Sequence, residues 1–544
     1  MSAQSFSVFR GLATILAGAV ILGLSSCSTT TFKPADALAA TTTPRQRMLL
    51  DADWLFHRGD VSTSNEVLSA SFDDRQWQRI QLPHDYVLDG TYDRANDPKH
   101  GYLPVVVGWY RKHLFISESA RGRILRLDFD GAFRDSEVWL NGQFLGRHLG
   151  GYTPFSYGIT QVARPGAENV ITVRVDPRES DGHWYEGGGI YRHVYLTTLP
   201  PLHVAQWGTY VVSKVPNGEQ GADAEADLTI QTTVENNGAV PADCSLVSEI
   251  VGPNGRSLQT MQTTESVAAN GQRDMLQQAV LQHPKLWSVQ SPHLYHLRTT
   301  LLQDGQPVDL TTTTFGIRTI RYDADQGFFL NGKHVKICGA ANHQDFPAVG
   351  IAVPDSLQAW RVAQLKQMGC NGWRTAHNPP NEAMLDACDR LGMLVMDENR
   401  HLGDSYLSHS PPGTTATNSE LATMIQRDRN HPSIIMWSLC NEEGLRGKPE
   451  GARLFLTMTK VVHRYDATRP ITCAINGNWL TNGIADEDLI GVNYHSRQYD
   501  DIHRANPHVP MFASETANNK TTRGEYLDDR TNGWVSGYNL TDGA

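Results

Sequence analysis

The sequence is poor in cysteine, and none of its cysteines forms a CxxC pair. Seven occur in 544 residues. Apart from Cys27, most of them lie inside apolar runs: Cys244, Cys338, Cys370, Cys388, Cys440 and Cys473. Buried free thiols are therefore a better interpretation than a metal site. An exported protein is permitted disulfides, but the pattern identifies none.

Charged residues are also few. They make up 19% of the chain, whereas hydrophobic residues make up 40%, which is typical of a folded soluble protein. The net charge of −11 is mildly acidic and argues against nucleic-acid binding. Because a chain of this length exceeds one ordinary hydrophobic core, we expect about two to four domains.

The apolar stretch at residues 11–24 is too short to span a membrane. It runs into Leu24-Ser25-Ser26-Cys27, which resembles the lipobox of bacterial lipoproteins. The resemblance implies a signal peptide that is removed before Cys27, which becomes the lipidated first residue of the mature chain. By the same resemblance, Ser28 implies sorting to the outer membrane. An uncleaved anchor is the alternative. We predict an exported, membrane-anchored protein, periplasmic or on the cell surface, whose residues 28–46 form a flexible tether.

The next part of the chain has a β pattern. Residues 53–199 consist of short alternating segments, and segment 137–142 ends in an Asn-Gly turn, which together predict antiparallel strands in an all-β sandwich. Residues 200–318 show a second β pattern whose length suits an immunoglobulin-like sandwich. This second region contains no group of residues that looks catalytic.

From about Phe328 the pattern changes to strand, loop and helix in repetition. Helices are predicted at 356–368 and 382–391, the latter ending at Gly392 as a helix C-cap would. Repeating βα units favour a (β/α)8 TIM barrel. The predicted strands are 335–338, 372–375, 394–397, 434–439, 471–474, 489–493 and 511–514.

These are seven strands where a closed barrel needs eight. A typical barrel takes roughly 250 residues, more than remain after Val335. We therefore expect a barrel that lacks its last strand, because the chain is a fragment or because strand eight comes from elsewhere. Unpaired edge groups and an unfilled core predict poor stability. Cooperative unfolding at ordinary mesophilic temperatures together with substrate turnover would contradict this expectation.

Carboxylates follow two of the predicted strands. Glu442 and Glu443 come after strand 434–439, and Glu515 comes after strand 511–514. A solvated loop pair is one interpretation of Asn-Glu-Glu, but barrel active sites lie where the strands end. A cleft flanked by two glutamates suits glycoside hydrolysis. The sequence does not give their separation; about 5–5.5 Å would indicate a retaining enzyme.

Segments 371–379 and 428–442 resemble the two signature segments of glycoside hydrolase family 2, which contains β-galactosidases, β-glucuronidases and β-mannosidases. The likeness extends to segments 72–77, 82–85 and 184–192. It implies a jelly-roll domain (47–200), an immunoglobulin-like domain (201–318) and a catalytic barrel (319–544). It also implies a retaining mechanism through a covalent glycosyl-enzyme intermediate.

By this resemblance Glu442 is the general acid/base and Glu515 the nucleophile. Glu443 is excluded, because adjacent residues on an extended chain point apart. Asn441 is suited to bind the sugar 2-hydroxyl, an interaction that strengthens in the transition state. Tyr494 matches a tyrosine that hydrogen-bonds the nucleophile.

His343 and His377 match substrate-binding histidines, although an isolated histidine is more often structural. Asp345 is a weaker candidate for binding sugar hydroxyls. Arg374 also belongs to the predicted substrate site, where charge pairing with the carboxylates fits it better than direct contact with the sugar. Trp437 is equally compatible with the core and with a sugar platform.

Two departures from the family pattern matter. After segment 394–399 the magnesium-ligating glutamate of the large enteric-type β-galactosidases is not evident, with Leu402 near its place. We therefore predict no required metal and no cofactor. The second departure is at the end of the chain, because the eighth strand of the family normally brings a tryptophan to the sugar. The Asn-x-Lys pair with which glucuronidases bind the substrate carboxylate also lies beyond this point.

The amino-acid sequences of three segments resemble those of bacterial β-galactosidases: 342–345, 374–380 and 522–526. The sequence thus predicts a retaining exo-β-galactosidase whose partners are a glycoside substrate and, through the lipid anchor, a membrane. β-Glucuronidase and β-mannosidase activity are the alternatives within the family, and an inactive carbohydrate-binding fragment is the alternative outside it. Whether the chain forms a homo-oligomer stays open.

Overall fold

The computed structural model describes residues 45–61, 64–180, 182, 184–216, 224–404, 417–479, 488–516, 527–529 and 531–532, all within one compact unit that begins at Thr43. The predicted signal peptide, Cys27, nearly all of the predicted tether and segment 522–526 lie outside these residues. Within them, no helix has the length and apolar character needed to cross a membrane.

The first domain is a sandwich of two antiparallel sheets, with strand orders β1-β10-β5-β8 and β3-β2-β4-β9-β6-β7. Asn141 and Gly142 link β6 to β7 with φ values of 52° and 81°, the left-handed conformation that a tight hairpin turn requires. The predicted sandwich is confirmed. Its strands are β1 (Gln46–Leu49), β2 (Trp54–Arg58), β3 (Gln78–Ile80), β4 (Gly108–Ile116), β5 (Ile124–Phe129), β6 (Ser136–Leu140), β7 (Gln143–His148), β8 (Phe155–Gly158), β9 (Ala167–Val175) and β10 (Val194–Leu199), with short helices α1 (Ser64–Val67), η1 (Tyr86–Asp89), η2 (Pro98–His100) and η3 (Glu118–Ala120).

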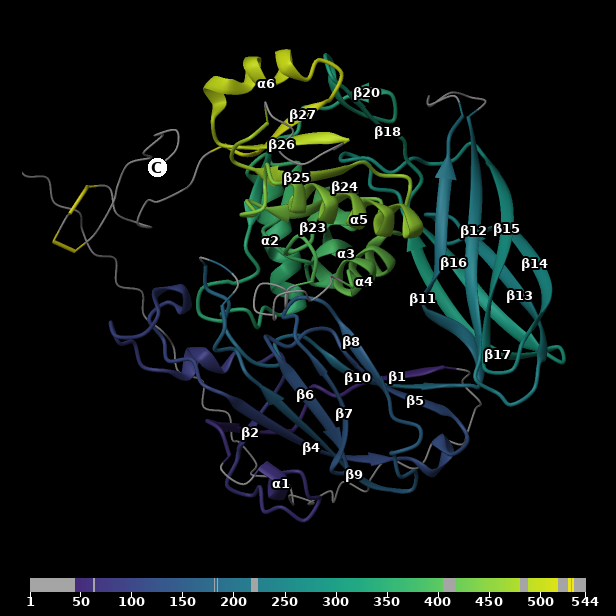
Figure 1. The fold of residues 1–544 in the computed structure, drawn as a ribbon. Helices are drawn as coiled ribbons and strands as arrows, with labels where there is room; N and C mark the ends of the chain where they lie inside the picture. Colours follow the sequence, from purple (N-terminus) through teal and green to yellow (C-terminus); the bar gives the residue numbers. More distant parts are fainter. Residues whose placement is uncertain are drawn as a thin grey trace, which may run out of the picture. The chain divides into compact units, whose positions relative to one another are not determined.

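The second domain is also a two-layered sandwich, with strand orders β11-β12-β15 and β14-β13-β16-β17, as Figure 1 shows. Alternate residues such as Leu228, Ile230, Ile250 and Leu297 are buried between the two layers. This confirms the immunoglobulin-like prediction. Its strands are β11 (Leu202–Lys214), β12 (Glu225–Asn236), β13 (Ala242–Val251), β14 (Ser257–Val267), β15 (Gly271–Gln282), β16 (Tyr295–Gln303) and β17 (Gln306–Phe315).

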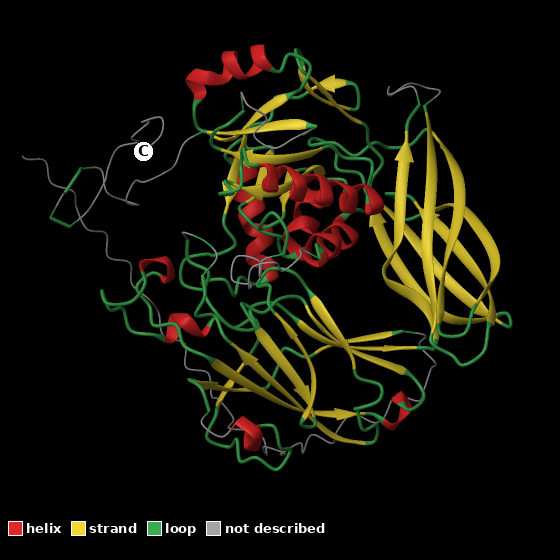
Figure 2. Cartoon of the chain, viewed as in Figure 1, coloured by secondary structure: helices red, strands yellow, loops and turns green. Residues whose placement is uncertain are grey.

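The barrel consists, in the described residues, of seven parallel strands paired in sequence order, with β21 and β27 at the two open edges. Helices lie against this sheet (Figure 2). The predicted TIM barrel is confirmed, and its eighth strand is missing from the residues that the structure describes. The strands are β21 (Gly339–Asn342), β22 (Gly372–Thr375), β23 (Leu394–Glu398), β24 (Ile434–Asn441), β25 (Ile471–Ile475), β26 (Leu489–Asn493) and β27 (Met511–Glu515), and the helices are α2 (Asp355–Gln367), α3 (Glu382–Leu391), α4 (Ser419–Asp428), α5 (Pro449–Tyr465), η5 (Ser496–Gln498) and α6 (Tyr499–Ala505).

A small antiparallel sheet precedes the barrel: β18 (Ile320–Asp323), β19 (Gly327–Leu330) and β20 (Lys333–His334). Phe328 and Leu330 on β19 are buried in one cluster with Met396 of β23 and Met436 of β24. The hairpin therefore packs against the apolar side chains of the barrel strands and shields them from water.

The first barrel strand was predicted in the wrong place. Residues 335–338 are not part of the parallel sheet, because the side chains of Val335 and Ile337 pack into the cluster of the small sheet. The strand is β21, made of Gly, Ala, Ala and Asn, residues with little β propensity. Gly339 pairs with Gly372 so closely that a Cβ on Gly339 would lie 2.8 Å from the Gly372 carbonyl oxygen.

The structure describes six cysteines, of which Cys244, Cys338, Cys370 and Cys388 are free thiols, while the Sγ atoms of Cys440 and Cys473 lie 3.3 Å apart. Four are buried, as predicted, namely Cys244, Cys388, Cys440 and Cys473. Cys338 is exposed and Cys370 is half-buried. These two lie just before β21 and β22.

Trp437 on β24 belongs to the core, which resolves its two interpretations. Its side chain is fully buried, and its indole N–H donates to Asp466 at 2.8 Å. Asp466 also accepts hydrogen bonds from the Tyr210 hydroxyl of the second domain (2.7 Å) and from Arg469 (2.6 Å). Burial alone would raise the pKa of Asp466, but the charge of Arg469 and these hydrogen bonds outweigh it and hold the pKa well below its ordinary value.

We expect Asp466→Asn to lower the free energy of unfolding by about 3 kcal/mol at pH 7, because it leaves the buried Arg469 without its counter-charge. A carboxylate with a lowered pKa in the folded state stabilises the fold above its unfolded pKa of about 4, and that stabilisation is lost as the pH falls further. Urea unfolding of the wild type and of Asp466→Asn should therefore show a difference in the free energy of unfolding that becomes smaller below about pH 4. A difference that stays constant with pH would contradict this account.

Candidate active site

Two carboxylates lie at the carboxyl ends of β24 and β27, which β25 and β26 separate in the parallel sheet. Glu442 follows β24, adopts a φ of 47° and donates its backbone N–H to the Ala474 carbonyl at 2.8 Å. Glu515 is the last residue of β27. In a barrel the carboxyl ends of all parallel strands face one side, so both glutamates belong to the same mouth.

Arg374 at the end of β22 connects this mouth. Its guanidinium donates to Glu515 at 2.7 Å, to Asn441 at 2.7 Å and to both oxygens of Glu398, at 2.8 and 2.9 Å. Arg374 is only 5% exposed. Burial would lower its pKa, but the charges of Glu398 and Glu515 outweigh burial and raise the pKa. Arg374 therefore forms ion pairs with two carboxylates, Glu398 and Glu515, which is the kind of contact predicted for it.

Glu398, the last residue of β23, was not among the predicted site residues. It is fully buried and accepts a hydrogen bond from the Ser438 hydroxyl at 2.7 Å, while His377 Nδ1 lies 2.8 Å from its other oxygen. Burial would raise the pKa of Glu398, but the Arg374 charge and these contacts lower it. Glu398 is thus an anion that anchors Arg374. Its position at the end of an apolar strand is the same signal that identified Glu515.

Asn493 at the end of β26 is a second residue that the sequence did not identify. Its amide N–H2 group donates to Glu442 at 2.9 Å and to Asn441 at 3.1 Å, and its oxygen accepts from the Ser514 hydroxyl at 2.6 Å. Asn441 accepts from both Asn493 and Arg374. A continuous hydrogen-bond network therefore joins Glu442 to Glu515.

The two predicted histidines lie on the same side of this network. His377 Nε2 is 3.6 Å from Glu515, and the rings of His377 and His343 are 5.3 Å apart. Burial lowers the pKa of His343 to about 4, and the electrostatic effects of His377 and of the Arg374 cation act in the same direction. His343 is therefore neutral at pH 7, a state in which one ring nitrogen donates and the other accepts.

Tyr494 and Asp345 complete the predicted set. Tyr494 follows β26 with a φ of 59°, and its backbone N–H donates to the Glu515 carbonyl at 2.6 Å. The bond from its side chain to the nucleophile stays a prediction. Asp345 lies in the loop after β21, where burial raises its pKa against the opposing charge of Arg361. Cys27 lies outside the described residues.

The neighbouring glutamates Glu442 and Glu443 have different partners. Glu443 Oε1 lies at hydrogen-bond distance, 2.8 Å, from His401 Nδ1. Glu442 instead accepts a hydrogen bond from Asn493. We expect Glu442→Gln to lower kcat by about 10²–10⁴-fold, the usual contribution of a general acid. The matched variant Glu443→Gln should stay close to wild-type activity. Steady-state kinetics with one aryl glycoside measures both, and an equal loss in the two variants would contradict the assignment.

Potential metal ligands gather at one place in the part of the chain that the structure describes: Asp386, Asp389 and His431. Asp389 already accepts hydrogen bonds from His431 Nδ1 at 2.6 Å and from the Ser433 backbone N–H at 3.0 Å. These contacts connect α3 to the start of β24. These hydrogen bonds give Asp389 a structural role.

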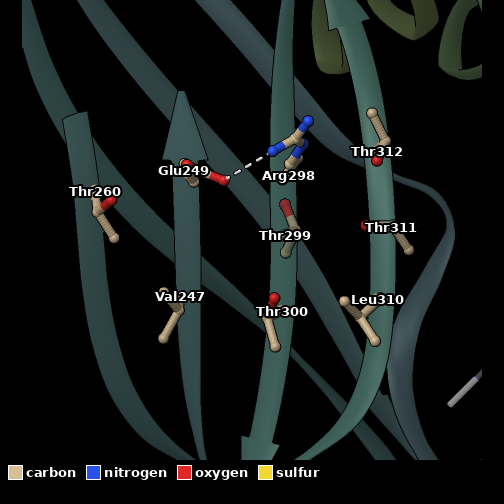
Figure 3. Close-up of a pocket in the computed structure, with 9 residues that line it drawn as sticks. All are labelled: Val247, Glu249, Thr260, Arg298, Thr299, Thr300, Leu310, Thr311 and Thr312. Atoms are coloured by element: carbon tan, nitrogen blue, oxygen red, sulfur yellow. Dashed lines mark hydrogen bonds and ion pairs between the residues drawn. The ribbon is translucent and has the colours of Figure 1, made fainter. Parts of the chain in front are cut away.

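A hollow of about 460 Å³ lies on the outer face of the second sandwich, along β13, β14, β16 and β17 (Figure 3). Its lining includes an ion pair between Glu249 and Arg298 at 3.5 Å. The remaining lining residues are threonines and aliphatic side chains: Val247, Thr260, Thr299, Thr300, Leu310, Thr311 and Thr312. It offers no pair of carboxylates, so the chemistry of the barrel mouth is not repeated there.

Three family models match the chain in succession. Residues 76–200 match the model of the sugar binding domain of glycosyl hydrolases family 2. Residues 212–318 match the model described simply as glycosyl hydrolases family 2. Residues 323–541 match the model of the family's TIM barrel domain. The chain belongs to glycoside hydrolase family 2.

Relatives within family 2 carry two different activities in their names. The β-galactosidase BoGH2A of Bacteroides ovatus is 34% identical over 528 residues, which are 89% of this chain and 60% of that protein. A β-glucuronidase of Bacteroides fragilis is 29% identical over 466 residues, 81% of this chain and 63% of that protein. The crystal structure of a family 2 member from Bacteroides cellulosilyticus matches with a TM-score of 0.79 and 34% identity, over 87% of this chain and 63% of the other. This family 2 chain thus spans less than two thirds of each of these proteins.

Proposed function

We propose that this protein hydrolyses terminal β-D-galactosides with retention of the anomeric configuration. The observation that supports the proposal is the network in which Glu515 and Glu442 lie at strand ends of one barrel mouth and have different partners. Glu515 contacts the cation of Arg374, and Glu442 contacts the neutral amide of Asn493. Two carboxyl groups in unlike environments suit the two roles of a glycosidase.

In the first step the carboxylate of Glu515, to which Arg374 donates a hydrogen bond, attacks the anomeric carbon. Glu442 donates its proton to the leaving glycosidic oxygen, so that the alcohol departs as the covalent glycosyl-enzyme forms. The Asn493 N–H bond to Oε1 of Glu442 leaves Oε2 to carry that proton. In the second step Glu442, now a carboxylate, takes a proton from water, whose oxygen attacks the anomeric carbon and releases Glu515.

The charge of the site supports a neutral sugar. Arg374 contacts two carboxylates, Glu398 and Glu515, and a third, Glu442, belongs to the same hydrogen-bond network. A glucuronate carboxylate close to this network would add a further negative charge, so binding it would require a cation other than Arg374. The likeness to the Bacteroides ovatus β-galactosidase supports galactose among neutral sugars, and the likeness to the Bacteroides fragilis β-glucuronidase keeps the glucuronide as the rival.

Purified protein assayed with 4-nitrophenyl β-D-galactoside, β-D-glucuronide and β-D-mannoside tests the substrate. We expect the galactoside to give the highest kcat/KM, and proton NMR of the first product to show the β-anomer. A preference for the glucuronide would reject the charge argument but retain the mechanism. An initial α-anomer would reject retention, and sugar binding without turnover would favour a carbohydrate-binding role.

A further inference from the structure

A tryptophan from the sugar-binding domain lies against the histidines of the barrel mouth. The ring centroid of Trp184 is 4.7 Å from that of His343 and 5.1 Å from that of His377. The guanidinium carbon of Arg400 lies 4.8 Å from the same ring. Trp184 therefore contacts both predicted sugar-binding histidines, although it belongs to a different domain.

The segment that follows Trp184 is fastened by one carboxylate, Asp85. Its oxygens accept hydrogen bonds from the Tyr185 hydroxyl at 2.9 Å and from the Gly188 backbone N–H at 3.1 Å. They also accept from the backbone N–H of Ile351 at 3.0 Å. Ile351 belongs to the barrel, on the loop that begins at His343. Asp85 thus accepts hydrogen bonds from both loops, the Trp184 loop (residues 184–188) and the His343 loop (residues 343–351).

The backbone around Asp85 is shaped for this carboxylate. Gly187 and Gly350 adopt φ values of +64° and +57°, and a Cβ on either of them would collide with the Asp85 Oδ2 atom. A fourth hydrogen bond comes from the Val87 N–H at 3.2 Å. Asp85 is itself 5% exposed. Glycines from both loops thus admit the buried carboxylate, and each of its oxygens accepts from more than one donor.

We propose that Asp85 is a positioning residue that joins the two loops, so that Trp184 holds His343 and His377 in place for the sugar. The proposal rests on the proposed glycosidase function and deepens it: the sugar-binding domain then helps to set the affinity of the catalytic site. The hydrogen bonds that Arg374 donates to Glu515 and Asn493 donates to Glu442 do not involve Asp85, Trp184 or His343. Losing it should therefore weaken substrate binding more than the chemical step.

Asp85→Asn tests the connection with little change in volume. An asparagine has one acceptor oxygen, and its N–H2 group would face a backbone N–H that needs an acceptor. We expect KM for the aryl galactoside to rise about tenfold while kcat changes by less than about threefold, the pattern of lost uniform binding. Trp184→Ala should reproduce this result, and Trp184→Phe, which retains an aromatic ring, should restore much of the affinity.

Asp97→Asn is the matched control. Asp97 lies in the same domain and accepts a hydrogen bond from the Lys99 backbone N–H at 2.9 Å, a local contact that involves no barrel residue. This variant should keep the wild-type KM. If Asp85→Asn lowers only the melting temperature and leaves KM unchanged, Asp85 has a structural role alone and the proposal is overturned.

Hydrogen exchange followed by mass spectrometry gives a readout that does not need turnover. In Asp85→Asn, peptides that cover Gly188 and peptides that cover Ile351 should both exchange faster than in the wild type. Faster exchange at Gly188 with unchanged exchange at Ile351 would overturn the connection between the loops. If the wild type hydrolyses none of the aryl glycosides, the proposed function fails by itself, and this exchange experiment still decides whether Asp85 joins the domains.

Discussion

Glu515→Gln is expected to remove glycoside hydrolysis and to leave the protein folded. The amide is nearly the same size as the carboxylate but is not a nucleophile, so no glycosyl-enzyme can form. We expect kcat to fall by about 10⁴-fold or more, the scale of loss when a covalent nucleophile is removed. Arg374 keeps its pairing with Glu398, so the circular dichroism spectrum should be unchanged. Stopped assays with an activated aryl galactoside measure the residual rate.

Azide distinguishes the two glutamates. In Glu515→Ala, azide can enter the space of the missing carboxylate and attack the anomeric carbon directly, which gives the α-glycosyl azide. In Glu442→Ala the glycosyl-enzyme still forms, and azide then attacks it from the opposite face, which gives the β-glycosyl azide. The same product from both variants, or wild-type activity in Glu515→Ala without azide, would contradict the assigned roles.

Arg374→Met is expected to have the largest effect on stability. The arginine holds the fully buried Glu398 and contacts Glu515, so its loss leaves an uncompensated charge in the barrel. Breaking a buried pair by removing one partner costs about 3–5 kcal/mol. Activity should also fall, because Asn441 and Glu515 each lose a hydrogen-bond donor that orients them.

Urea unfolding of Arg374→Met, Glu398→Gln and the double variant measures this interaction. The double variant should be more stable than Arg374→Met, because it removes the unpaired charge together with its partner. Arg374→Lys keeps the charge but has no planar guanidinium that could contact Glu398, Asn441 and Glu515 together. Its free energy of unfolding should therefore lie between those of the wild type and Arg374→Met. A loss below about 1 kcal/mol in Arg374→Met would show that the pair behaves like an exposed ion pair.

The barrel could be predicted from the sequence where its strands are apolar and end at turn signals. β24 and β25 are buried along nearly their whole length, and their predicted positions differ from the structure by only one or two residues. β21 could not be predicted in this way, because its small residues carry no apolar run. Its position follows from the close contact of Gly339 with Gly372, a pairing between distant parts of the chain that local patterns do not encode.

The residues of the site also fall into two groups: those that local sequence patterns predict and those that depend on packing between distant parts of the chain. Glu442 and Glu515 were predicted because the ends of parallel strands meet at one edge, whichever residues lie between them. The importance of Asn493 depends on its reaching Glu442 across β25, and that of Asp85 on its reaching Ile351 in another domain. Such contacts depend on how strands and domains pack, and residue spacing alone does not give that information. Glu398 could have been found, since it too ends an apolar strand.

The central claim is that Glu515 forms a covalent bond to the sugar. A 2-deoxy-2-fluoro-β-D-galactoside with an activated leaving group tests it directly, because the fluorine slows breakdown of the glycosyl-enzyme and allows it to accumulate. We predict that intact-mass measurement finds one fluoro-galactosyl group per chain and that peptide sequencing places it on Glu515. Hydrolysis of the ordinary galactoside without any such adduct, or an adduct on a residue other than Glu515, would contradict the account.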